Sequence, residues 1–343
     1  MGVKIGFILL QGSQRPGTSA ISDLLKKNWP KVLIFIVVAL ALYLVPAFVS
    51  SVYWISVLLL CNYYAALACS WDILSGHTGD LNFGYAFFVG GAGYAAALLN
   101  LHYGTPPYLT IFLAGLLAAA FGFIIGALCL KLRGPYFAIV TLSVAAILYK
   151  LTSIFWEVLG GEEGLSGIDP LSGSEITDFY ISTTGLIFTF LVLYTLSNSR
   201  FGLILKAIGE NEDTAQASGI PTARYKVLAS VISAFFAGTA GSFYVHTQMH
   251  VGQDMVSGSS SATIVLMAVV GGMGTIVGPL VGAYLLTFMN EILRGFGEQR
   301  LLIYSALVLG IIFISPRGLW SFIQARGSPL LRAFNLNLKN GRL

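Results

Sequence analysis

Side chains that could carry out catalysis or bind a metal are few in this chain, and their spacing does not fit the common sites. The four histidines lack cysteine or carboxylate partners at zinc-ligand spacing, and the pair at positions 246 and 250 lacks the glutamate of a His-Glu-x-x-His helix. The sequence contains no Gly-x-x-x-x-Gly-Lys-Ser/Thr loop for ATP phosphates and no Gly-x-Ser-x-Gly elbow for a nucleophilic serine. We therefore expect no catalytic residue, no metal site and no cofactor, and we do not expect an enzyme.

The most informative polar segment is a short stretch within the charged region 199–226. Asn211 can cap the N-terminus of a helix, Gly219 fits the position just after its C-terminus, and Pro221 prevents continuation. The pattern predicts a helix of about two turns, which is marginal in water when isolated. We expect the neighbouring chain, or a groove in a partner protein, to hold it. The site residues predicted here are Asn211, Glu212, Asp213, Thr214, Ala215 and Gly219.

The elements that must position this segment are membrane-spanning helices. Apolar residues make up 56% of the chain and charged residues 10%, with a mean hydropathy of +0.80. A soluble domain carries about 25% charged residues, so this chain could not cover its surface with polar groups in water. The same composition also excludes a disordered chain and a disulfide scaffold. The sequence predicts an all-α polytopic integral membrane protein.

Runs without charged residues indicate the number of crossings. A spanning helix needs about 20 apolar residues, so the runs hold about ten transmembrane helices, some of them short or broken. The run 255–290 is assigned two helices, because a single one would place the basic tail on the wrong side. The charge-free runs are 32–71, 81–130, 179–199, 227–253, 255–290 and 301–316, and the run 134–156 is interrupted only by Lys150.

Basic residues predict the orientation. Most of the 19 Lys and Arg residues fall on the side that an even number of spans assigns to both termini, so both termini are predicted to be cytoplasmic. The division is a cytoplasmic segment 1–31, a transmembrane domain 32–316 and a basic tail 317–343. Within the domain, 199–226 is a cytoplasmic loop and 157–178 an outer loop. The acidic residues placed on the outer side are Glu157, Glu162, Glu163, Asp169, Glu175, Asp178, Asp254, Glu291 and Glu298.

The excess of basic residues on the predicted cytoplasmic side explains the net charge of +4 without a nucleic-acid partner. The basic tail can contact anionic membrane lipid. Ionisable residues close to the membrane midplane are scarce, because Lys150 and Glu291 can each lie near a helix end and extend to the interface. An ion-coupled carrier usually keeps such residues in the membrane, so their scarcity weighs against a carrier. A secondary carrier or channel is the alternative class of function.

Glycine is abundant in this chain, with 39 of the 343 residues. The spacing Gly-x-x-x-Gly lets helix backbones touch, and a glycine cluster followed by Pro279 can break a helix near the membrane midplane. Broken helices expose backbone groups to a transport pathway, whereas close helix packing is the alternative explanation. The candidate pathway or helix-break positions are Gly90, Gly91, Gly271, Gly272, Gly274 and Gly278.

At this point the motifs carry a family resemblance. Asp213-Thr214-Ala215-x-x-x-Gly219 resembles the Glu-Ala-Ala-x-x-x-Gly signature of ATP-binding cassette (ABC) importer permeases. From about residue 64 to 318 the chain resembles the branched-chain amino acid ABC transporter permease family, in particular its LivM-like subunit. Asp213 and Thr214 depart from the signature, and Asp80 stands where the family tends to have a neutral amide. The motifs, in family order, are Leu132–Ala138, Gly164–Ile168, Lys206–Ile220 and Gly271–Pro279.

The resemblance implies a multi-pass permease of a high-affinity uptake system in a bacterial or archaeal cytoplasmic (inner) membrane. It implies four kinds of partner: a homologous second permease subunit, two ATPase subunits, an extracytoplasmic solute-binding protein near loop 157–178, and membrane lipid. ATP-driven movement would pass through the helix at 211–219, with Ala215 small because it faces the ATPase. Branched-chain amino acids are the expected solutes, and urea or short amides are the alternative.

The missing phosphate-binding loop leads to a first prediction. The purified chain in lipid should hydrolyse ATP only at background rate until ATPase subunits are added, because it has no loop to hold the nucleotide phosphates. Phosphate release from proteoliposomes with and without those subunits measures this. Substantial turnover by the isolated chain would contradict a function that depends on partner ATPases.

Overall fold

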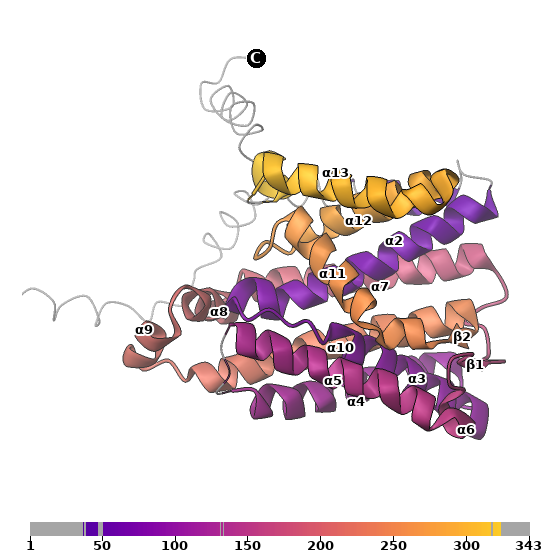
Figure 1. Cartoon of the computed structure of the whole chain (residues 1–343), viewed down its shortest axis with the longest axis horizontal. Coiled ribbons are helices and arrows are strands. Elements are labelled where there is room, and N and C mark those ends of the chain that lie inside the picture. Colours follow the sequence, from indigo (N-terminus) through magenta and orange to yellow (C-terminus); the bar gives the residue numbers. More distant parts are fainter. Residues whose placement is uncertain are drawn as a thin grey trace, which may run out of the picture. The chain divides into compact units, whose positions relative to one another are not determined.

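The computed structural model describes residues 37, 39–46, 51–130, 132, 134–316 and 318–323. The chain divides into two units, residues 1–50 and 51–343. In the first unit, residues 37 and 39–46 are helical. The second unit carries every element labelled in Figure 1. The predicted N-terminal segment 1–31 and most of the predicted basic tail lie outside the described residues.

The second unit is built from helices, which confirms the predicted all-α architecture. Within the described residues, five helical segments are long and apolar enough to cross a membrane: Val52–Gly76, Pro107–Leu128, Pro135–Ile154, Glu175–Ser197 and Thr222–Gln248. In Figure 1 they correspond to α2 (Val52–Trp71) with the π-helical turn η1 (Asp72–Gly76), α4, α5, α7 and α10. The other helices of ten or more residues are α3 (Tyr85–Tyr103), α8 (Arg200–Glu210), α11 (Gly258–Gly271), α12 (Val277–Ile292) and α13 (Arg300–Ile314).

Proline and glycine set several helix boundaries. Pro107 and Pro135 occupy the first positions of α4 and α5, where the missing N–H costs nothing. Gly104 follows the last residue of α3 with a left-handed φ of 59°. The predicted run 81–130 therefore holds two helices, α3 and α4, and the run 255–290 likewise holds α11 and α12. The total of ten crossings stays a prediction.

Helix α10 lies at the centre of the unit, against α2, α3 and α4. Small residues allow this close approach: a Cβ atom at Gly122 of α4 would lie 2.6 Å from the Cβ of Ala234 and 2.8 Å from the carbonyl oxygen of Ser230, both on α10. The Ser230 hydroxyl donates to the Gly122 carbonyl over 2.8 Å. Backbone contact, rather than large interlocking side chains, holds these two helices together.

A buried amide joins three helices. The Nδ2 of Asn62 on α2 donates to Ser182 (2.9 Å) and Thr183 (3.0 Å) on α7, and Tyr284 on α12 donates to its Oδ1. Inside a membrane no water is available to satisfy such groups, so each must find a protein partner. The network sets the register of α2, α7 and α12.

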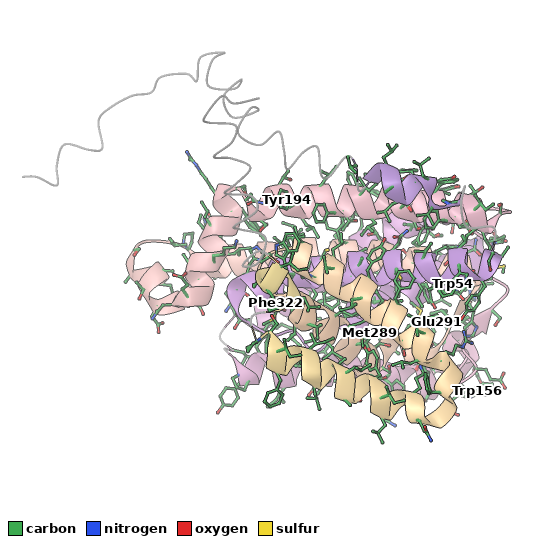
Figure 2. All side chains as sticks on the ribbon, turned by 90° about the horizontal axis from the view of Figure 1, so that it is seen from above. Trp54, Trp156, Tyr194, Met289, Glu291 and Phe322 are labelled. Carbon is green, nitrogen blue, oxygen red and sulfur yellow. The ribbon has the colours of Figure 1, made fainter. Side chains whose placement is uncertain are left out.

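The two ends of the helix body differ. At one end lie α6 (Trp156–Leu159) and the strand pair β1 (Leu165–Ser166) and β2 (His250–Val251), whose antiparallel register pairs Leu165 with Val251. Figure 2 shows Trp54, Trp156 and Glu291 at this end. At the other end α8 and α9 (Glu212–Ala217) project from the body. Tryptophans gather at membrane interfaces, so these rings are typical of one membrane boundary.

The close contact of α4 and α10 leads to a second prediction. Gly122→Ala places a methyl group against Ser230 and Ala234, which should destabilise the protein by about 1–3 kcal/mol. Gly185→Ala on α7 is the matched control, because nothing lies within 4 Å of that Cβ position. Melting temperatures of the purified variants in detergent measure the difference. Equal melting temperatures for the two variants would contradict the packing.

Candidate functional site

The capped segment predicted at 211–219 forms the short helix α9. The Oδ1 of Asn211 accepts from the backbone N–H of Thr214 over 2.9 Å, as an N-terminal cap does. Gly219 adopts a left-handed φ of 84°, and the N–H of Ile220 donates to the carbonyl of Ala215 over 3.1 Å. The local structure therefore has the predicted cap and glycine stop. Its role in coupling stays a prediction.

The environment of Ala215 differs from the expectation. Its side chain is only 5% exposed in this single chain, and α9 packs against α8 and α10. Its own chain already covers the methyl group, which accounts for the small side chain without a partner. Contact of Ala215 with a partner stays a prediction. Asp213, Thr214, Gln216 and Ala217 are exposed, so a partner can contact this face of α9.

Helix α9 is attached to the start of α10 by a buried ion pair. The Nζ of Lys226, on the second turn of α10, lies 3.3 Å from the Glu212 carboxylate. The hydroxyl of Thr222 donates to the same carboxylate over 3.2 Å and accepts from the side-chain amide of Gln216 over 2.8 Å. Since charge pairs with little exposure are screened weakly by solvent, these contacts fix α9 on α10.

Lys226 also pairs with Asp80, which lies between η1 and α3. Its Nζ is 2.6 Å from the Asp80 carboxylate, and both side chains are at least nine-tenths buried. The other carboxylate oxygen of Asp80 accepts from the N–H of Gly134 over 3.4 Å, immediately before α5. The charge of Asp80, which departs from the family pattern, thus has a physical reason: an amide could accept from Gly134, but it could not neutralise Lys226.

Sequence reasoning missed this triad of Asp80, Lys226 and Glu212. A signal was present, because two acids and one base stand close to predicted span ends. Which of them meet depends on how the helices pack. The lining of a small recess at this point includes Asp80, Cys129, Phe137 and Lys226.

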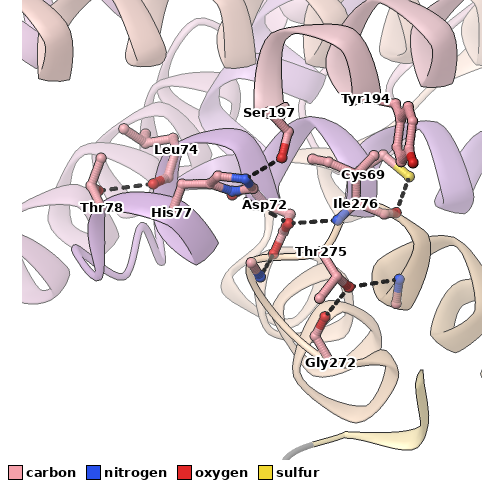
Figure 3. Close-up of polar contacts among 12 residues, drawn as sticks. Cys69, Asp72, Leu74, His77, Thr78, Tyr194, Ser197, Gly272, Thr275 and Ile276 are labelled. Atoms are coloured by element: carbon pink, nitrogen blue, oxygen red, sulfur yellow. Dashed lines mark hydrogen bonds and ion pairs between the residues drawn. The ribbon is translucent and has the colours of Figure 1, made fainter. Parts of the chain in front are cut away.

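A second buried carboxylate holds the interruption between α11 and α12. Asp72, the first residue of η1, is fully buried, and its carboxylate accepts from the N–H groups of Gly274 (2.6 Å) and Ile276 (3.1 Å), as Figure 3 shows. The hydroxyl of Thr275 donates to the carbonyl of Gly272 over 2.9 Å. Asp72 therefore satisfies backbone donors that a continuous helix would have satisfied itself.

The glycine cluster at 271–278 does interrupt a helix. Gly272 and Gly274 have φ values of 115° and 77°, and even Ile276 has a φ of 55°. Positive φ is strained for a β-branched residue, so the bonds from Asp72 hold Ile276 in place. A Cβ atom at Gly278 would lie 2.7 Å from the Thr275 hydroxyl oxygen, and a Cβ atom at Gly271 would come closer still to the carbonyl oxygen of Gly278.

Gly90 and Gly91 do not break a helix, because α3 continues through both. The prediction of a break at this place is wrong. Gly90 instead makes room for the 3-10 turn η2 (Gln253–Val256): a Cβ atom there would meet Val256, and it would lie 3.1 Å from the backbone of Met255. Any role of these glycines in a pathway stays a prediction.

A neutral histidine connects Asp72 to α7. His77, one residue beyond η1, is buried, and burial lowers its pKa to about 4. Its Nδ1 lies 2.9 Å from the Asp72 carbonyl, which can only accept, so Nδ1 carries the proton and Nε2 accepts from the Ser197 hydroxyl over 2.6 Å (Figure 3). The ring holds the end of α2 against the end of α7 without carrying a charge at neutral pH.

Comparison with known proteins identifies the chain. A family model described as the permease component of branched-chain amino acid transport systems matches residues 53–315. The chain belongs to this family. In this permease the family motifs include Gly134 and Gly274, the residues whose N–H groups bind Asp80 and Asp72.

Relatives cover most of the permease. The high-affinity branched-chain amino acid transport system permease protein LivM of Escherichia coli K12 is 31% identical over 337 residues, 90% of this chain and 77% of that protein. The LivM protein of Salmonella typhimurium is 30% identical over 286 residues, 75% of this chain and 67% of that protein. The autoinducer 2 import system permease protein LsrC of an Enterobacter species is 33% identical over 207 residues, 57% of this chain and 58% of that protein. No solved structure matches the chain.

The ion triad leads to a third prediction. Lys226→Met removes the only ammonium group within 4 Å of the Asp80 and Glu212 carboxylates among the described residues, and should cost about 3–5 kcal/mol of stability. Lys206→Met on α8 is the control, because that lysine is exposed. Melting temperature and limited proteolysis of the loop 199–226 measure the effect. If both variants behave like the unchanged protein, the triad does not hold α9.

Proposed function

We propose that the chain is one permease subunit of an ABC importer that carries branched-chain amino acids across a bacterial or archaeal cytoplasmic membrane. The observation that supports this most strongly is the match to the permease family over residues 53–315. The capped helix α9, which projects with α8 from one end of the helix body, adds to it. The names of the LivM relatives support the solute. Urea or short amides stay the alternative solutes, because a separate binding protein would select them.

In this proposal ten helices cross the membrane and both termini are cytoplasmic. The division into 1–31, 32–316 and 317–343 follows from it, with the loop of α8 and α9 inside and the loop of α6 and β1 outside. Support comes from the position of the basic residues Arg200, Lys206 and Arg224 at the end with α9 and of Trp54 and Trp156 at the opposite end.

Helix α9 would dock on an ATPase subunit through its exposed face, which includes Asp213 and Thr214. Movement of α9 would reach α10 through Glu212 and Lys226, and α5 through Asp80 and its bond to Gly134. An ion pair suits this role, because it resists separation in a buried setting and can still rotate as the helices tilt. Chemical energy would therefore enter through the partner ATPases and arrive as displacement of the helices.

The remaining partners would be a second homologous permease subunit, a second ATPase and an extracytoplasmic solute-binding protein. Large exposed apolar side chains on α4, α5 and α13, with Phe313 at 86% exposure, suit lipid or a neighbouring permease. The outer loop 157–178 is acidic and is held by the pairing of β1 with β2, which would offer the binding protein a fixed surface.

The docking proposal leads to a fourth prediction. Gly219→Val forces a β-branched residue into the left-handed backbone conformation that Gly219 adopts. This conformation costs about 1–2 kcal/mol of conformational free energy and should displace the end of α9. Asp213→Lys reverses the charge of the exposed face. Both variants should insert normally, lose most ATP-driven leucine uptake and co-purify poorly with the ATPase subunits. Ala215→Trp should displace α9 from its own chain with the same loss.

Gly185→Val is the matched control, since Gly185 lies on α7 with open space around its Cβ position. Uptake into vesicles and co-purification with the ATPase subunits are measured for every variant after expression is normalised. Wild-type uptake and partner binding in all three α9 variants would show that this helix is an ordinary loop element.

A further inference from the structure

The chain that follows α10 descends into the membrane layer before α11 begins. The side-chain amide of Gln253 donates to Ser153 over 2.7 Å, next to the last residue of α5. A Cβ atom at Gly258 would lie 3.7 Å from Leu142, which is in the first half of α5. Eleven residues of helix separate these two contact points on α5, or about 16 Å along its axis. Residues 253–258 thus run down the side of a spanning helix.

This descending segment presents polar groups outward. Asp254, Gly258 and Ser259 are exposed, and Ser257 and Ser260 are partly exposed. Asp254 follows Gln253 near the end of α5, whereas Gly258 and Ser259 lie alongside its first half. A hydroxyl that faces hydrocarbon at the depth of Ser259 is unfavourable, and ionisable groups inside membranes normally face a water-filled cavity or the interior of the protein. The segment therefore faces water or another polar surface, and not lipid tails.

The Asp254 carboxylate has no ion pair and no hydrogen bond among the described residues, unlike those of Asp72 and Asp80. Its backbone carbonyl accepts from the hydroxyls of Ser257 and Ser260, each at 2.6 Å, and from the N–H of Ser257 over 3.2 Å. These bonds fix the turn, and the carboxylate lies beside the backbone of Gly252 and the ring of His250. A rigid backbone with a free carboxylate is the arrangement of a binding group.

Tyrosines pack behind this segment. Met255 and Val256, which follow Asp254, belong to the same buried cluster as Tyr63 and Tyr94, and Tyr244 packs against that cluster. The rings of Tyr63 and Tyr244 stack with centroids 4.3 Å apart, and the Tyr94 hydroxyl is buried without a hydrogen-bond partner in the described part of the chain. The unpaired carboxylate suits an organic cation, because an ionised carboxylate only accepts hydrogen bonds and a charged donor forms the strong ones.

We propose that Asp254 and the serines that follow it line the water-filled solute pathway, where the Asp254 carboxylate binds the ammonium group of the amino acid in transit. This inference rests on the proposed function, because an amino acid carries the positive group that the carboxylate would meet. Urea and short amides carry no such group, so Asp254 would also favour amino acids over them.

Thiol labelling tests the pathway independently of the solute. Ser259→Cys and Asp254→Cys in the assembled importer are treated with a small, membrane-impermeant trimethylammonium methanethiosulfonate. The native Cys61, Cys69 and Cys129 are buried, so the unchanged protein supplies the background. Phe188→Cys, at an apolar position of α7 that is 60% exposed, is the control. Both test cysteines should react about tenfold faster than the control. Equally slow reaction would overturn the proposal.

Uptake of L-leucine tests the charge. Asp254→Asn should lower uptake about tenfold or more, because the ammonium group loses its counter-charge, whereas Asp254→Glu should keep most of it. Co-purification with the ATPase subunits should stay unchanged in both variants, since α9 is untouched. Wild-type uptake in Asp254→Asn would overturn the role of the carboxylate.

Chemical rescue covers a variant that assembles poorly. Asp254→Cys modified with a carboxyethyl methanethiosulfonate regains a negative charge and should regain uptake, whereas the trimethylammonium reagent should not restore it. Rescue by both reagents, or by neither, would count against the proposal. A failure of the proposed function looks different: the unchanged importer would then show no ATP-driven leucine uptake, while the labelling result would still stand.

Discussion

The Lys226 ammonium between the carboxylates of Asp80 and Glu212 is the contact on which this end of the permease depends. It joins three elements: α9, the start of α10 and the loop before α3. Asp80 extends the contact to the start of α5 through Gly134. Because these charges are largely out of water, each one requires the others, and removing one leaves the rest uncompensated. The same dependence makes the triad suitable for passing movement from α9 to the spanning helices.

Backbone satisfaction imposes the second constraint. Where a buried chain leaves helical geometry, its N–H groups have no water to bind. Asp72 meets this requirement for Gly274 and Ile276, and Thr275 meets it for the Gly272 carbonyl and the Gly278 N–H. His77 in turn holds the turn that carries Asp72 against Ser197 of α7. The interruption between α11 and α12 is thus a fixed structure, supported by α2 and α7, and sits beside the loop that bears Asp80.

The polar segment 253–260 leads into α11, and the first residues of α11 show that its two sides differ. Buried bonds such as that of Ser261, which accepts from the N–H of Ala86 over 2.8 Å, fix one side against α3. The opposite side exposes Gly258 and Ser259. A helix in a soluble protein often has such a polar face toward water, but a helix beside the spanning segment α5 needs a water-filled space to do so. This segment is where we propose that the packing of the permease meets its transport pathway.

Much of this architecture was determined by the sequence alone. Hydropathy, capping and turn residues act over a few neighbouring positions, so the helical membrane class, the capped α9 with Gly219 and the interruption at Gly271–Pro279 were predictable. Gly90 was a candidate for a break with close packing as the alternative, and the structure shows packing, because a glycine that breaks a helix and one that admits a neighbour look alike in sequence. Only the tertiary structure decided that Gly90 admits η2, that Ala215 faces its own chain and that Asp254 lies beside a spanning helix. It also decided the partners of the buried charges, since Asp72 and Gly274 are 202 positions apart. Ion pairs and hydrogen bonds depend on which surfaces meet after packing, and no local pattern records that.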